Sequence, residues 1–119
     1  MLIKKDQAKV VDQGTKVIRK YPASDKLLEV NHMILNGRTP VGENTFLRET
    51  KVHFMILVIK GSGRIYCGSE IFNVEEGDSV DVPAGTKFAA EGNLEYITAE
   101  SPAWYKEQAT IVDIHGKEI

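Results

Sequence analysis

The sequence contains no long hydrophobic run. Its longest uninterrupted apolar stretch, Phe54 to Ile59, has six residues, far short of the roughly 20 that a membrane-spanning helix needs. The first residues, Met1 to Ile3, are followed at once by the charged segment Lys4 to Asp6, so the start of the chain lacks the apolar stretch of a secretory signal. We therefore expect a cytoplasmic protein that does not associate with a membrane.

An excess of charge of one sign is also lacking. Fifteen basic residues stand against seventeen acidic residues, which gives a formal net charge of −2 with both signs scattered along the chain. A nucleic-acid-binding surface normally shows as a clustered basic excess. The sequence therefore predicts no nucleic-acid partner.

Cysteine and histidine are scarce. The single cysteine, Cys67, excludes an internal disulfide and a multi-cysteine metal site, and a lone thiol fits a reducing compartment. Only three histidines are present, His32, His53 and His115. Few residues are thus available to bind a transition metal.

Helical periodicity is not evident either, and the chain consists of short runs rich in β-branched and aromatic residues, separated by turn residues. This pattern is typical of an all-β sandwich or barrel, and 119 residues are enough for one such domain. The segment Lys4 to Val11 is compatible with a short helix or an edge strand. The runs are residues 27–35, 52–59, 64–67, 71–74, 79–82, 87–90 and 94–99, and the expected chain reversals are at Asn36-Gly37, Gly61-Ser62-Gly63, Gly68-Ser69, Glu76-Gly77-Asp78, Pro83-Ala84-Gly85 and Gly92-Asn93.

The run from Phe54 to Ile59 is apolar at every position, whereas a strand with one wet face alternates apolar and polar residues. Strand alternation places Phe54, Ile56 and Val58 on one face of this strand, and we consider the case in which that face is the interior. Met55, Leu57 and Ile59 then need a second cover, which a partner subunit or the N-terminal arm would supply. Since closed symmetric dimers are the commonest oligomers, we expect a homodimer.

The segment from Gly77 to Gly92 resembles the second motif of the cupins, a family of small β-barrels. That motif runs glycine, five residues, Pro-x-Gly, two residues, histidine, three residues, asparagine, and the matching positions are Gly77, Pro83, Gly85, Phe88 and Gly92. The resemblance implies a cupin-type double-stranded β-helix, also called a jelly-roll barrel. It predicts one domain over residues 1–119, with a barrel core at about 27–105, an N-terminal arm at 1–26 and a C-terminal tail at 106–119.

The first cupin motif has His-x-His, three or four residues, glutamate, six residues and glycine. Counting back from Gly61 places the glutamate position at Phe54. The resemblance therefore implies that Phe54, and with it Ile56 and Val58, faces the barrel interior. The histidine positions fall on Arg48 and Thr50, or on Leu47 and Glu49 with the longer spacing. The two registers send opposite residues inward, and both remain open here.

The metal ligands implied by the resemblance are missing from both motifs. Phe54 and Phe88 occupy two of the four ligand positions, and a phenyl ring has no lone pair for a metal. A rewired site using His32 and His53 is the alternative, although strand alternation sends His53 to the face opposite Phe54. We therefore expect no metal and no other cofactor.

Three functions remain. The first is binding of a small organic molecule in an apolar cavity. The second is a metal-independent sugar isomerase or epimerase, since some barrels of this fold pair a histidine base with a tyrosine acid. The third is a structural or regulatory dimer with a filled barrel. The candidate catalytic residues are His53, Tyr66 and Tyr96. Trp104 lies in a Ser-Pro-x-Trp segment that resembles the tail of many small cupins. The candidate ligand-binding residues are Phe54, Phe88, Arg48, Thr50, Tyr96 and Trp104.

Overall fold

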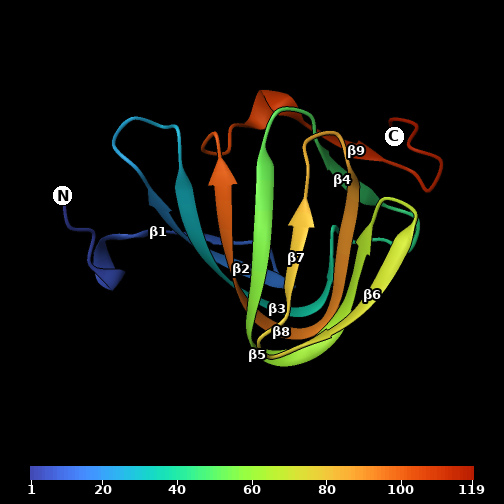
Figure 1. Ribbon diagram of the computed structural model, residues 1–119, viewed down its shortest axis with the longest axis horizontal. Coiled ribbons are helices and arrows are strands. Elements are labelled where there is room, and N and C mark those ends of the chain that lie inside the picture. Colours follow the sequence, from blue (N-terminus) through green and yellow to red (C-terminus); the bar gives the residue numbers. More distant parts are fainter.

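The computed structural model describes residues 1–119, and nearly all of its regular structure is β-strand (Figure 1). Nine strands form a single sheet in which β1, β2, β3, β8, β4 and β9 are neighbours in that order, while β5 pairs with β6, β7 and β8. The two helical turns, η1 and η2, have three residues each, and neither could span a membrane. The elements are η1 (Lys5–Gln7), β1 (Lys9–Asp12), β2 (Lys16–Pro22), β3 (Glu29–Thr39), β4 (Phe46–Glu49), β5 (His53–Cys67), β6 (Glu70–Glu75), β7 (Ser79–Val82), β8 (Lys87–Ser101), η2 (Lys106–Gln108) and β9 (Ala109–Val112).

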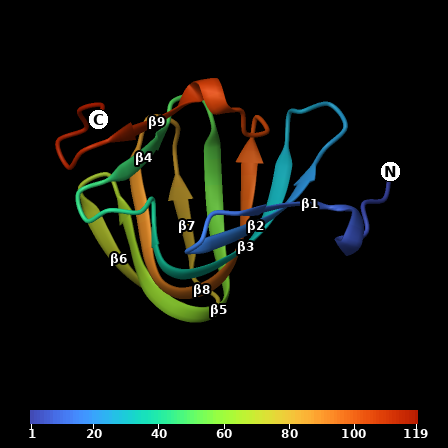
Figure 2. The same cartoon turned by 180° about the vertical axis from the view of Figure 1, so that it is seen from behind.

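The long strands β3, β5 and β8 bend strongly, so that the sheet curls into a half-barrel with two facing walls (Figures 1 and 2). The first half of β5 pairs with β7 and with the end of β8, and its second half pairs with β6 and with the start of β8. Each of these long strands therefore contributes to both walls. The all-β jelly-roll prediction is confirmed.

Three of the expected chain reversals are wrong, because they are bends inside continuous strands. Gly37, Gly92 and Gly63 pair with one another in a row across β3, β8 and β5. A Cβ atom on Gly63 would lie 2.3 Å from the Glu91 carbonyl oxygen, and one on Gly92 would lie 2.7 Å from Gly63 Cα. Glycine is thus required where these paired strands bend sharply. At these three positions, glycine marks a bend within a strand and not a turn between two strands.

The N-terminal segment, which we expected as an arm over residues 1–26, adds two strands to the sheet. The single turn η1 precedes β1, which pairs with β2, and β2 pairs with β3. Lys4 to Val11 thus holds both a short helical turn and an edge strand. The arm leaves the outer face of β5 uncovered, since Met55 and Leu57 are each 47% exposed.

The hydrophobic core fills the bent end of the half-barrel. Strand alternation places Phe54, Ile56 and Val58 inside, as predicted, and all three are buried. They pack with apolar side chains from β3, β6, β7 and β8, among them Leu35, Val74, Val80 and Leu94. The open end between the walls is not filled by this core.

Candidate functional site

A cavity of about 660 Å³ lies between the two walls of the half-barrel. One part of its lining is apolar and includes Phe54, Phe88, Met33 and Leu47. The Phe54 and Phe88 rings meet edge to face, with centroids 5.2 Å apart and an interplanar angle of 87°. The two rings therefore do not fill the barrel, and the third expected function, which required a filled barrel, loses its premise.

The other part of the cavity is polar and contains side chains beyond those expected from the sequence. Asn31 on β3 and Thr98 and Glu100 on β8 are all buried and line the cavity. Asn31 Nδ2 donates to Glu100 Oε2 at 2.5 Å, and Thr98 Oγ1 donates to the same oxygen at 2.8 Å. No protein donor reaches the second carboxyl oxygen, Oε1.

Burial has the largest effect on the pKa values of Glu100 and Tyr96. It raises the pKa of the Glu100 carboxyl, although the hydrogen bonds from Thr98 and Asn31 oppose the shift. It also raises the pKa of the Tyr96 hydroxyl above its usual range, with the Glu100 charge adding to the effect. Asn31 Oδ1 is buried without a donor, and an orphaned polar atom of this kind is uncommon in a native interior.

A second buried carboxyl, Glu49, stands at the end of β4. Its Oε1 accepts a hydrogen bond from Trp104 Nε1 at 3.0 Å, and its Oε2 accepts one from Gln108 Nε2. Gln108 Oε1 in turn accepts from the backbone N–H groups of Lys51 and Val52, each at 3.2 Å. Both oxygens of Glu49 are thus occupied, while burial raises the pKa of this carboxyl.

Two lysines from β2 complete the polar part. Lys16, Ile18 and Lys20 point to the same face by strand alternation, and all three line the cavity. Lys20 Nζ lies 2.5 Å from Glu29 Oε1. Burial lowers the pKa of Lys16, while the nearby charges of Glu100 and Glu49 oppose the shift.

The candidate residues from the sequence divide into two groups. Phe54, Phe88, Tyr96 and Trp104 line the cavity, and so do Leu47 and Glu49, which selects the longer spacing of the first motif. Arg48 and Thr50 do not line it. Arg48 Nη1 donates to the Gly116 carbonyl at 3.0 Å, and Thr50 Oγ1 donates to the Gln108 carbonyl at 2.5 Å.

Two of the catalytic candidates lie away from the cavity. His53 is exposed, as strand alternation predicts, and its Nε2 lies 2.5 Å from Asp81 Oδ1. The Tyr66 hydroxyl donates to Glu91 Oε1 at 2.5 Å, and its ring packs against Phe46. His32, which the rewired metal site required, pairs with Glu95 at 2.8 Å, at a site distant along the sheet from His53. The histidine–tyrosine pair expected for an isomerase is therefore not assembled here.

The sequence reasoning missed Lys16, Asn31, Thr98 and Glu100. An available signal was the period of two in β8, because Leu94 and Tyr96 face inward and Thr98 and Glu100 follow at the same spacing. For β2 the signal was weaker. Its inner face has the sequence Lys16, Ile18 and Lys20, and two lysines out of three do not resemble a core strand.

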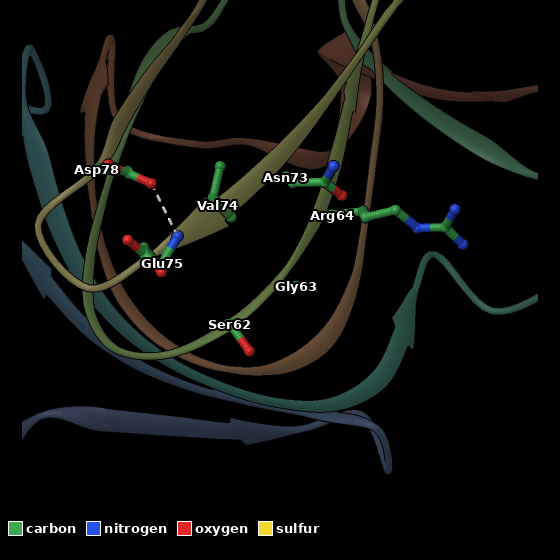
Figure 3. Close-up of a pocket in the computed structure, with 7 residues that line it drawn as sticks. All are labelled: Ser62, Gly63, Arg64, Asn73, Val74, Glu75 and Asp78. Carbon is green, nitrogen blue, oxygen red and sulfur yellow. Dashed lines mark hydrogen bonds between the residues drawn. The ribbon is translucent and has the colours of Figure 1, made fainter.

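A second hollow of about 450 Å³ lies at the bend, between β5, β6 and the turn before β7 (Figure 3). Its lining is mostly exposed and polar, with Val74 as its only hydrophobic residue. Asp78 Oδ2 accepts a hydrogen bond from the Glu75 backbone N–H at 2.8 Å, which closes the turn on itself (Figure 3). The hollow lacks the enclosed and converging side chains of the cavity between the walls.

Known structures share this fold over most of the chain. A Streptomyces Pac13 variant with uridine matches with a TM-score of 0.83 at 16% identity, over 95% of this chain and 90% of that chain. Ectoine synthase from P. lautus matches with a TM-score of 0.75 at 14% identity, over 94% and 90%. An RmlC-like cupin from Shewanella frigidimarina matches with a TM-score of 0.67 at 18% identity, over 82% and 86%. This chain has the cupin fold. No protein-family model and no curated protein matches the sequence.

The residues at the cupin metal position do not fit a metal ion. In the register that the structure selects, the four positions hold Leu47, Glu49, Phe54 and Phe88. Only Glu49 has a donor atom, and both of its oxygens already accept hydrogen bonds from Trp104 and Gln108. No group of three or more His, Cys, Asp or Glu side chains is placed to hold a metal ion. No chemistry is assigned to a metal at this cupin site.

Proposed function

We propose that the protein binds a small organic molecule in the cavity between the walls of its cupin half-barrel. One observation carries this proposal: a cavity of about 660 Å³ combines an aromatic wall with buried polar side chains that converge on it. Ligand sites usually have this size and this composition, with apolar surface for affinity and few polar groups for orientation. The similar structures support the binding of a small molecule, since Pac13 is a nucleoside dehydratase and a Pac13 variant was solved with uridine.

A thermal-shift screen tests the proposal. The panel contains nucleosides including uridine, sugars, amino-acid derivatives and small carboxylic acids. A ligand present at 100 times its dissociation constant adds about 2.7 kcal/mol to the free energy of unfolding, which raises the melting temperature clearly. A panel without any stabilising compound counts against the proposal.

A pair of variants locates the binding. Leu47 lines the cavity, whereas Leu57 lies on the outer face and is 47% exposed. We expect Leu47→Trp to obstruct the cavity and abolish the thermal shift, and Leu57→Trp to leave it unchanged. A ligand that still stabilises the Leu47→Trp variant binds elsewhere, and its site then contradicts the proposal.

A specific observation favours a second candidate, a metal-independent isomerase or epimerase. Glu100 has one oxygen held by two donors and the other without a donor, in a setting where burial raises the pKa of the carboxyl. A carboxyl with a raised pKa holds its proton at a higher pH than a free glutamate does, which suits a general acid or base. Glu100 would then take the role that we expected of His53, with Tyr96, one of the two expected tyrosines, as its partner.

Hydrogen exchange separates the enzyme from the binding module. A compound found in the screen is incubated with the protein in D₂O, and loss of its C–H signals is followed by NMR. An acid–base enzyme gives exchange that Glu100→Gln abolishes while binding is retained. Exchange that is equal with and without the protein removes the enzymatic candidate and leaves the binding function intact.

A further inference from the structure

Two lysines of β2, Lys16 and Lys20, line the cavity, and only Lys16 lacks an ion-pair partner. It is only 9% exposed and lines the cavity. Its ammonium group makes no hydrogen bond or ion pair within the protein, whereas the next inward lysine along the strand, Lys20, pairs with Glu29 at 2.5 Å. A buried charge without a partner is costly, and burial accordingly lowers the pKa of Lys16.

The nearby carboxyl groups do not pair with this lysine. Glu49 uses both oxygens to accept hydrogen bonds from Trp104 and Gln108. Glu100 uses one oxygen to accept from Asn31 and Thr98. Neither carboxylate lies within ion-pair distance of Lys16 Nζ, although both act on it through their charge. The lysine therefore remains free to receive an acceptor from a bound molecule.

We propose that Lys16 anchors the carboxylate group of a small organic acid whose apolar body lies against Phe54 and Phe88. The proposal rests on the proposed function of the cavity and names the class of its ligand. A carboxylate suits the site better than a phosphate, because a phosphate carries up to two negative charges and Glu49 and Glu100 act on the same space. The Tyr96 hydroxyl has no protein partner and offers a second hydrogen bond to the ligand.

Matched carboxylate and amide pairs test the proposal. Benzoate, phenylacetate and 3-hydroxybenzoate are compared with their primary amides by ligand-observed NMR and titration at fixed ionic strength. Each pair has nearly the same shape and differs in charge. We expect the wild-type protein to bind each carboxylate at least tenfold more tightly than its amide.

Two neutral variants and one control complete the design. Lys16→Met and Lys16→Gln remove the charge and bury no new charge, so at least one is expected to fold, as circular dichroism will show. The carboxylate preference should fall below about threefold in both variants. The control Lys51→Met removes an exposed lysine whose side chain makes no hydrogen bond, and it should keep the preference.

The outcomes separate the two proposals. Equal binding of acids and amides by the wild-type protein, or an undiminished preference in both Lys16 variants, overturns the anchor while binding in the cavity stands. If no acid or amide binds and the broader screen also finds no ligand, both proposals fail. If the broader screen finds only neutral or cationic ligands, the anchor fails and the function of the cavity remains.

Discussion

Phe54 and Phe88 lie on opposite walls of the half-barrel, and their rings meet edge to face across it with centroids 5.2 Å apart. Phe54 is near the start of β5 and pairs with Glu100, whereas Phe88 is near the start of β8 and pairs with Cys67. The contact therefore joins two parts of the sheet that the hydrogen-bond ladder keeps apart.

Removing one ring should loosen this connection. Both rings are almost fully buried, with 6% of Phe54 and 4% of Phe88 exposed. We expect Phe88→Ala to lower the free energy of unfolding by about 3–5 kcal/mol, measured by urea denaturation. Phe72→Ala is the control, because Phe72 is 36% exposed on β6. Equal losses in the two variants would contradict a special role for the contact between the walls.

The hydrogen bond from Trp104 to Glu49 fastens the chain after β8 to β4. Trp104→Phe keeps an aromatic ring and removes the indole N–H, so a buried carboxyl oxygen loses its donor. Leaving such a group unsatisfied costs about 1–3 kcal/mol, and urea denaturation will measure the loss. Tyr105→Phe is the neighbouring control, since Tyr105 is 43% exposed and should change stability little.

Stability should fall as the pH rises from mildly acidic to neutral values. Burial raises the pKa of Glu100 in the folded protein above its ordinary value of 4.5. Between these two pKa values the folded state holds a proton that the unfolded state has released, so raising the pH favours unfolding. Glu49 contributes in the same direction.

The variant Glu100→Gln tests this pH dependence, because glutamine accepts the hydrogen bonds of Asn31 and Thr98 without titrating. We expect a flatter profile of unfolding free energy between pH 4.5 and 8, with a gain over the wild-type protein at the upper end. Lys16, whose pKa is lowered, acts with the opposite sign at alkaline pH and is common to both proteins. Parallel profiles would refute the assignment to Glu100.

Gly92 should tolerate no side chain. It has a φ of +128°, and an added Cβ would lie 2.7 Å from Gly63 Cα and from the Ser62 carbonyl oxygen. Gly77 has a comparable φ of +92° with open space around it. Backbone strain alone costs about 1–3 kcal/mol, so we expect that loss in Gly77→Ala and a larger one in Gly92→Ala. The difference in urea midpoints isolates the clash, and a smaller effect at Gly92 would contradict it.

The outer face of β5 carries an apolar surface that no part of the chain covers. Met55 lies beside Ala99 of β8, which lies beside Val30 of β3, and Leu57 lies beside Ile97. We propose that a second copy of the chain covers this surface, which is the homodimer expected from the sequence. Light scattering at micromolar concentration should give a dimer for the wild-type protein and for Ile71→Glu on β6, and a monomer for Leu57→Glu. A monomeric wild-type protein ends the proposal.

Strand alternation divided β5 into two faces, whatever its partners, and the resemblance to the first cupin motif indicated that the face with Phe54 is the inner one. Sequence reasoning failed at Gly61-Ser62-Gly63 and Gly92-Asn93, because a glycine that reverses the chain and a glycine that bends two paired strands have the same local signal. Only the partner strand distinguishes them. The polar half of the cavity was missed for a related reason, since Lys16 and Glu100 look like solvent-facing residues until β2 and β8 are paired through β3.

The row formed by Gly37, Gly92 and Gly63 makes the backbone pairing of the walls independent of the side chains in the cavity. Because β3, β5 and β8 pass through this row without interruption, the backbone pairing that holds the two walls is complete beneath the cavity. The side chains at the open end contribute nothing to that pairing, so phenylalanine can stand at the positions where the cupin motifs have a metal ligand. The same bent strands can therefore carry different sets of side chains in the cavity.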